Sequence, residues 1–260
     1  MKITNRQKMQ IKRSVSVLCS CMMLFLLTGC GQSRYDMAYT VNSDVSSLRL
    51  VNIEEKNLNA EPFASDLCVV SSDISIPGID TSKADGAGLF DVNGRNTLYA
   101  KNVYEKLYPA SLTKIMTALV AIESGKLDSK IRFSENAVYN LEEGSSHVGI
   151  QVGEVLSMRR ALYGLMLESA NDVANGIAET VGGSISGFAD LMNAKAAELG
   201  CVNTHFTNPH GLQNEEHYTC ARDMALITQA ALKHPTFQKI AGTTNYTCPK
   251  TNKVDEERYW

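Results

Sequence analysis

The amino-acid sequence predicts an α+β fold, in which a β-hairpin comes first, a block of helices follows, and strands begin again near the end of the chain. Three observations support this prediction. A turn sequence separates two short apolar stretches within residues 86–101, apolar stretches of helical period fill much of residues 112–233, and residues 243–247 have a strand-like composition. The chain has 260 residues, of which 44% are hydrophobic and 20% charged, which is typical of a protein with a packed core.

The hairpin is predicted by Asn93-Gly94, because both residues tolerate the positive φ that a tight hairpin turn requires. Ala87–Asp91 would form its first strand and Thr97–Ala100 its second. Leu67–Val70 is another short strand candidate, and Thr243–Thr247 would begin a further strand. Since a lone hairpin is only marginally stable, these strands need other elements to pack against.

The helices are predicted from their apolar faces and from the glycine or proline residues that end them. Ser134 would cap a short helix, and residues 207–211 (Thr-Asn-Pro-His-Gly) would form a turn. The longer predicted helices are Leu112–Glu123 before Gly125, a helix that starts at Ser157 and includes Met166, Asp172–Thr180 before Gly182-Gly183, Ile185–Leu199 before Gly200, and Ala221–Lys233 before His234-Pro235.

The first 29 residues have the layout of a secretory signal peptide. They carry five basic residues and no acidic ones, and their apolar run, Val15–Leu27, is shorter than the roughly 20 residues of a membrane-spanning helix. Leu27-Thr-Gly-Cys30 resembles a bacterial lipobox, which implies cleavage before Cys30 and lipid modification of that cysteine. An uncleaved anchor helix is the alternative, and it too leaves the protein facing outward. We therefore expect an extracytoplasmic protein held to the bacterial cell membrane by a lipid anchor.

Charge and cysteine usage limit the possible partners. Residues 30–64 are polar, which predicts a flexible tether. Residues 65–260 are predicted to form the folded domain. Removal of residues 1–29 leaves 20 Lys and Arg against 28 Asp and Glu, a net charge of −8 that argues against nucleic acid as a partner.

Neither the cysteines nor the five histidines show metal-ligand spacing, so we expect no metal and no cofactor. Cys19 and Cys21 leave with residues 1–29, and Cys30 is expected to carry the lipid. The other four cysteines allow three pairings, none of which the sequence selects: Cys68, Cys201, Cys220 and Cys248.

Ser111 and Lys114 open the first strong helix and form a candidate nucleophile and base. Residues three apart share a helix face, so the Lys114 amine can reach the Ser111 hydroxyl. A serine hydroxyl is a poor nucleophile until a base removes its proton, and a lysine can act as that base only when it is neutral. Burial lowers a lysine pKa toward that condition. Taken alone, Ser-x-x-Lys is also what an ordinary helix start looks like.

Ser169-Ala-Asn171 is a second candidate, because it lies between two predicted helices and can direct a hydroxyl and an amide into one cleft. The same spacing occurs in Ser134-Glu-Asn136, where Ser134 is better explained as a helix cap. The setting Leu167-Glu-Ser-Ala-Asn-Asp-Val-Ala174 favours Ser169.

Four segments together resemble one protein family. Tyr108-Pro-Ala-Ser-Leu-Thr-Lys-Ile-Met-Thr-Ala118 resembles the nucleophile segment of the serine D-alanyl-D-alanine carboxypeptidases, low-molecular-mass penicillin-binding proteins of peptidase family S11. Glu168-Ser-Ala-Asn-Asp172 is similar to that family's Ser-x-Asn loop, and residues 206–212 and 217–225 are similar to two further stretches. The resemblance implies the penicillin-binding-protein/β-lactamase-like transpeptidase fold, an antiparallel sheet flanked by helices with a helical subdomain, and makes residues 65–260 its catalytic domain.

The resemblance also implies an activity and a role for each candidate residue. The enzyme would remove the terminal D-alanine from peptidoglycan stem peptides through an acyl-enzyme, and β-lactams would inhibit it. Ser111 would be the acyl-ester nucleophile and Lys114 the proton acceptor. Ser169 would relay a proton to the leaving amine, and Asn171 would bind the substrate or the Lys114 side chain.

The family's third motif, Lys-Thr-Gly, does not occur in these 260 residues, and Lys250-Thr-Asn252 is the nearest string. We therefore expect a domain truncated before that motif, with C-terminal strands missing, and no labelling of residues 30–260 alone by a fluorescent penicillin. Lys250 in the motif's place is the rival interpretation. Two other functions stay open: a β-lactamase, which needs a base for rapid deacylation that the sequence does not identify, and a non-catalytic wall-binding lipoprotein.

Overall fold

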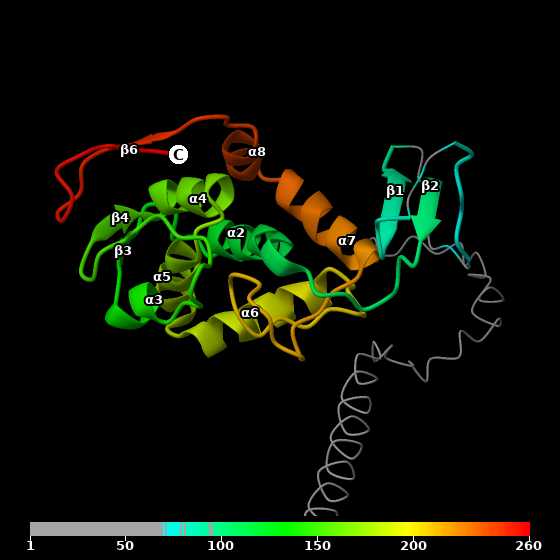
Figure 1. Ribbon diagram of the computed structural model, residues 1–260, viewed down its shortest axis with the longest axis horizontal. Coiled ribbons are helices and arrows are strands. Elements are labelled where there is room, and N and C mark those ends of the chain that lie inside the picture. The colour runs from blue at the N-terminus through cyan, green and yellow to red at the C-terminus, as the bar shows by residue number, and fades with distance from the viewer. Residues whose placement is uncertain (1–69, 71, 79, 81, 94–95) are drawn as a thin grey trace, which may run out of the picture. The chain divides into compact units, whose positions relative to one another are not determined.

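The computed structural model describes residues 70, 72–78, 80, 82–93 and 96–260 (Figure 1). The predicted signal peptide, Cys30, the tether over residues 30–64, nearly all of the strand candidate Leu67–Val70, and Gly94 of the hairpin turn lie outside the described residues.

The predicted hairpin is confirmed. Strands β1 (Ala87–Asp91) and β2 (Asn96–Lys101) pair antiparallel, with a register shift between Leu89 and Phe90. Ile74 adds an isolated antiparallel bridge to Ala100 on the other side of β2. One end of helix α7 packs beside β1, so the strand pair has the support that an isolated hairpin lacks.

Helix α2 (Thr113–Glu123) lies at the centre of the helical block and continues directly from a short 3₁₀ turn, η3 (Ala110–Leu112). It contacts five other helices, and nine of its eleven residues are buried. An α-helix that is apolar nearly all round is stable only when neighbours cover it on every side. Those neighbours, which surround α2 in Figure 1, are α4 (Met158–Leu167), α5 (Asn171–Gly182), α6 (Ile185–Glu198), α7 (Ala221–Leu232) and α8 (Pro235–Ala241).

The helix ends follow from local sequence. Ser157 and Ser184 cap α4 and α6 through their side-chain oxygens, and Ser134 caps the short helix α3 (Glu135–Tyr139) as predicted. Gly183 ends α5 with a φ of 77°, a left-handed conformation that costs glycine little. The predicted longer helices are all confirmed, with bounds within a few residues. None of the helices in the described part of the chain is long and apolar enough to cross a membrane.

The strands of the structure differ from the predicted ones at two places. Sequence patterns gave no sign of β3 (Lys130–Arg132) and β4 (Val155–Ser157), which pair antiparallel. The strand expected over Thr243–Thr247 is wrong for most of its length, since β5 is only Thr247–Cys248, paired with β6 (Arg258–Tyr259). Over the described residues the sheet structure therefore consists of three separate two-stranded pairs, and the α+β class is as predicted.

The segment after β5 is fixed to the β3–β4 pair. Asn252 Oδ1 accepts a hydrogen bond from the Val155 amide at 2.7 Å, and Asn252 Nδ2 donates to the Gly153 carbonyl at 3.0 Å. Lys250-Thr-Asn252, the string nearest to the family's third motif, is thus tied by its last residue to the start of β4. Of the cysteines, Cys201, Cys220 and Cys248 are free thiols.

Candidate active site

Ser111 lies in η3, where the chain enters the central helix, and its side chain is exposed. The preceding residue, Ala110, has a φ of 47°, which is uncommon for a residue with a Cβ. Backbone held in this region stores strain of about 1–3 kcal/mol and persists only where surrounding contacts enforce it. The strained turn presents the Ser111 hydroxyl at the N-terminal end of α2.

Lys114 lies one turn further on, with only 3% of its surface exposed. Its Nζ is 3.1 Å from Ser111 Oγ and 2.9 Å from the carbonyl oxygen of His210. Burial disfavours the ammonium form and lowers the pKa of Lys114 to about 8. A neutral amine, which can accept a proton from Ser111, is therefore accessible near neutral pH.

Ser169 approaches Ser111 from the junction of α4 and α5, and its Oγ donates a hydrogen bond to Ser111 Oγ at 2.9 Å. It too has a left-handed backbone, with a φ of 54°. Ser111 Oγ is thus bonded to an amine from α2, the helix that follows η3, and to a hydroxyl that lies 58 positions further along the chain.

Asn171 is the first residue of α5 and is buried, and within the described part of the chain its Oδ1 has no hydrogen-bond partner. The backbone N–H of Asn171 donates to the Ser146 carbonyl at 2.9 Å. The buried carboxylate of Asp172 accepts hydrogen bonds from the Val148 and Ile150 amides, at 3.3 and 3.0 Å. These bonds fix residues 146–150 against the start of α5, next to Ser169.

The alternative pair with the same spacing has a structural role. Ser134 caps α3 through a bond from the Ala137 amide, and its hydroxyl donates to Glu179 at 2.7 Å. Asn136 donates to the same carboxylate at 2.9 Å. Both side chains connect α3 to α5.

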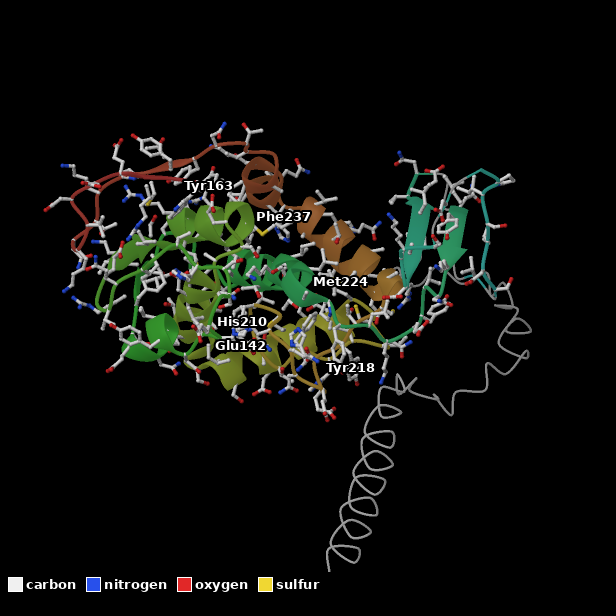
Figure 2. All side chains as sticks on the ribbon, viewed as in Figure 1. Glu142, Tyr163, His210, Tyr218, Met224 and Phe237 are labelled. Carbon is white, nitrogen blue, oxygen red and sulfur yellow. The ribbon has the colours of Figure 1, made fainter. Side chains whose placement is uncertain are left out.

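The turn over residues 207–211 contributes to the site in a way that sequence reasoning missed. His210, which Figure 2 labels, uses its backbone carbonyl rather than its imidazole to contact Lys114. The Pro209 carbonyl accepts from Thr117 Oγ1 at 2.6 Å, one turn along the same face of α2. Gly211 is packed against Ala110 so closely that an added Cβ would lie 1.8 Å from the Ala110 carbonyl oxygen. A backbone contact leaves no side-chain signal, although the glycine of Asn-Pro-His-Gly could have indicated the close approach.

Two buried neutral histidines support this turn. The Thr207 amide donates to His217 Nδ1 at 3.1 Å, so Nε2 carries the proton and donates to Thr113 Oγ1 at 2.8 Å. Burial, and then the charge of His205, lowers the pKa of His217 to about 4. Burial, and then the Lys114 and His217 charges, lowers the pKa of His210 to about 3. Neither imidazole adds positive charge beside Lys114 at neutral pH.

The arrangement suits acyl transfer to Ser111. A buried amine next to a hydroxyl can accept its proton, and a second hydroxyl on the same oxygen can pass a proton to a departing group. In the described ranges, no group of three or more His, Cys, Asp or Glu side chains is placed to hold a metal ion.

Comparison with known proteins agrees with this geometry. The family described as Peptidase_S11, D-alanyl-D-alanine carboxypeptidase, matches residues 74–257. The D-alanyl-D-alanine carboxypeptidase DacF of Bacillus subtilis is 38% identical over 184 residues, which is 68% of this chain and 46% of DacF. DacA of Escherichia coli is 34% identical over 169 residues, 61% of this chain and 41% of DacA. The chain thus spans less than half the length of these two relatives.

Solved structures show the same fold. The carboxypeptidase DacD of Francisella tularensis superposes with a TM-score of 0.59 at 34% identity, covering 70% of this chain and 44% of DacD. A D-alanyl-D-alanine carboxypeptidase of Mycobacterium tuberculosis superposes with a TM-score of 0.63 at 29% identity, covering 73% of this chain and 69% of that one. The DD-transpeptidase of Streptomyces K15 gives 0.60 at 32% identity, with 67% and 70% covered. The predicted penicillin-binding-protein fold is confirmed.

Proposed function

The chain belongs to the D-alanyl-D-alanine carboxypeptidase family, Peptidase S11, and on that premise we propose that it carries the nucleophile of a cell-wall carboxypeptidase. The enzyme removes the terminal D-alanine from peptidoglycan stem peptides that end in D-Ala-D-Ala. One observation supports this proposal above all others. Ser111 Oγ lies 3.1 Å from the buried Lys114 amine and 2.9 Å from Ser169 Oγ, so a base and a proton relay meet at one exposed hydroxyl.

The reaction has two steps. In the first, neutral Lys114 takes the Ser111 proton while Oγ attacks the carbonyl carbon of the D-Ala-D-Ala bond. The carbon–nitrogen bond then breaks, and Ser169 passes a proton from Lys114 to the nitrogen, which leaves as D-alanine. In the second step, water gives a proton to the same relay and attacks the ester carbonyl. The bond to Ser111 Oγ breaks, the relay returns the proton to Oγ, and the shortened peptide leaves.

Asn171 is suited to hold the substrate. Its Oδ1 is buried and has no partner among the described residues. Leaving a buried acceptor unpaired costs about 1–3 kcal/mol, so we propose that a substrate amide reaches Oδ1 when the cleft is occupied and regains that bond. We assign Asn171 to substrate binding on this basis.

β-Lactams are expected to inhibit the enzyme. Their ring amide presents a carbonyl to Ser111 as the dipeptide does, but the leaving nitrogen stays attached to the acyl group. It therefore remains near the ester and hinders attack by water. The intact protein, by which we mean a chain that also supplies the family's third motif, is accordingly expected to form a long-lived covalent adduct, whereas residues 30–260 alone are expected to form none.

Release of D-alanine tests the activity. The intact protein is incubated with a peptide ending in D-Ala-D-Ala, and D-alanine is measured with a D-amino-acid oxidase assay. We expect release by the wild type and none by Ser111→Ala, while Ser134→Ala, the serine of the structural pair, retains activity in its folded fraction. Release by Ser111→Ala at the wild-type rate would falsify the proposal.

We also propose that the protein is exported and anchored through lipid on Cys30. A basic start, a short apolar run and Leu27-Thr-Gly-Cys30 support this localisation. The test is fractionation of cells grown with a labelled fatty acid. Wild type is expected in the membrane fraction with label on Cys30, and Cys30→Ala without label. Equal labelling of Cys30→Ala would contradict the anchor but leave the carboxypeptidase proposal intact.

A further inference from the structure

Asn208 closes the turn over residues 207–211, which contacts α2. Its Oδ1 accepts hydrogen bonds from the His210 amide at 3.2 Å and from the Gly211 amide at 2.7 Å. Its Nδ2 donates to the Leu212 carbonyl at 3.0 Å. One half-buried side chain thus binds three backbone groups within the four residues that follow it.

The closed turn directs two carbonyls at one face of α2. The His210 carbonyl lies 2.9 Å from Lys114 Nζ, and the Pro209 carbonyl accepts from Thr117 Oγ1 at 2.6 Å. The His210 carbonyl and the Gly211 N–H belong to the same planar peptide unit. That N–H donates the shorter of the two hydrogen bonds that Asn208 Oδ1 accepts. The Asn208 side chain therefore sets the orientation of the carbonyl that holds Lys114.

Orientation matters because a neutral lysine amine has two N–H groups and one lone pair. When one N–H is directed at the His210 carbonyl, the amine is held against the end of η3 and its lone pair can face Ser111 Oγ. A lysine side chain without that acceptor regains rotamer freedom and spends less time in the productive geometry.

From these contacts we infer that Asn208 is a positioning residue for proton transfer between Ser111 and Lys114, acting through the His210 carbonyl. The inference rests on the proposed acyl transfer at Ser111, and adds a residue to it that touches neither substrate nor nucleophile.

Asn208→Ala is compared with a matched variant, Asn193→Ala. Asn193 is also half-buried, and its side chain also bonds backbone groups. It accepts from the Phe206 amide and donates to the Phe206 carbonyl, each at 2.8 Å. Both variants lose hydrogen bonds to the backbone, but only the Asn208 side chain bonds within the turn over residues 207–211.

The measurement is the second-order rate of acylation of the intact protein by a fluorescent β-lactam from pH 6 to pH 10. We expect Asn208→Ala to be at least about tenfold slower at every pH, and Asn193→Ala to stay within about twofold of wild type.

Asn208→Asp supplies a second readout that loss of folding does not mimic. The aspartate keeps both acceptor bonds to the turn amides but places a negative charge near Lys114, which favours the ammonium form. Its acylation rate is expected to recover at high pH, with the midpoint of the pH profile moved upward by about one unit. The ¹³Cε NMR titration of Lys114, assigned by comparison with Lys114→Met, is expected to shift in the same direction and requires no turnover.

The inference is overturned if Asn208→Ala acylates within twofold of wild type, or if Asn193→Ala is slowed equally. If Asn208→Ala does not fold, Asn208→Asp decides the matter, and an unchanged pH midpoint and NMR titration overturn the inference. A wild-type protein that forms no adduct would instead contradict the proposed function.

Discussion

Gly211 lies directly against the carbonyl of Ala110, the residue that precedes Ser111. A Cβ added to Gly211 would lie 1.8 Å from that oxygen and 2.8 Å from Thr113 Oγ1, and the φ of Gly211 is 88°. Ala110, with its strained φ of 47°, thus packs against the backbone of Gly211, where there is no room for a side chain. The 3₁₀ turn η3, which carries Ser111, therefore packs tightly against the turn over residues 207–211.

This contact predicts that Gly211→Ala both destabilises the protein and slows acylation. The backbone conformation alone costs about 1 kcal/mol, and the clash adds to it by displacing Ala110. Gly183→Ala is the control, because Gly183 also has a positive φ, 77°, but nothing lies within 4 Å of its added Cβ. Chemical denaturation is expected to show the larger loss of unfolding free energy in Gly211→Ala, and only that variant is expected to acylate slowly. Equal behaviour of the two variants would contradict the fit.

Acylation is predicted to depend on pH through Lys114. Because burial lowers the pKa of Lys114 to about 8, the neutral base should be about a tenth of the total at pH 7 and about nine tenths at pH 9. The second-order acylation rate should therefore rise about tenfold over that interval and then level off. Stopped-flow measurements with a chromogenic β-lactam check this. A rate that is flat from pH 7 to pH 9 would mean that Lys114 is not the titrating base.

Lys114 is also predicted to destabilise the folded protein at neutral pH. Its pKa is lower in the folded than in the unfolded state, so the ammonium costs folding free energy below pH 8, and this cost disappears above pH 10.5. Replacement by Met should raise the free energy of unfolding at pH 7 by about 2 kcal/mol, after the lost hydrogen bonds are subtracted. Lys126→Met, at an exposed lysine that donates to the Thr180 carbonyl, should bring no such gain. A lower free energy of unfolding for Lys114→Met than for the wild type at pH 7 would show that burying the ammonium does not carry this cost.

Acid should unfold the protein partly through His217. Its folded pKa of about 4 lies below its ordinary value of 6.5, so its contribution to stability is constant above pH 6.5. As pH falls from 6.5 to 4, the unfolded chain binds a proton that the folded chain does not, which costs about 1.4 kcal/mol for each pH unit. His217→Gln should reduce the slope of unfolding free energy against pH by about that amount in this window. An unchanged slope would show that His217 is not buried in its neutral form.

The sequence patterns predicted those elements that carry their own local signals. The helix stripes span several turns and end at residues such as Gly183, so their bounds were predictable. β3 and β4 have three residues each, too few to show an alternating pattern. The His234-Pro235 pair indicates the end of a helix, but Pro235 also starts α8, where its missing N–H costs nothing.

The site was predictable to a similar degree. Spacing alone places Lys114 on the same helix face as Ser111. The approach of Ser169 depends on how α4 and α5 pack on α2, which spacing does not specify, and there the family resemblance supplied the prediction. The contact from His210 was not predictable from residue type, because its backbone carbonyl makes the bond.

If Ser111 is the nucleophile, the acyl group is attached to its Oγ, and mass spectrometry can locate that group. The intact protein is incubated with a β-lactam, digested, and analysed by tandem mass spectrometry. We predict a single adduct on the peptide that contains Ser111, with fragment ions placing the added mass on that residue, and no adduct in Ser111→Ala. An adduct on Ser169, or one that persists in Ser111→Ala, would contradict the assignment of Ser111 as the nucleophile.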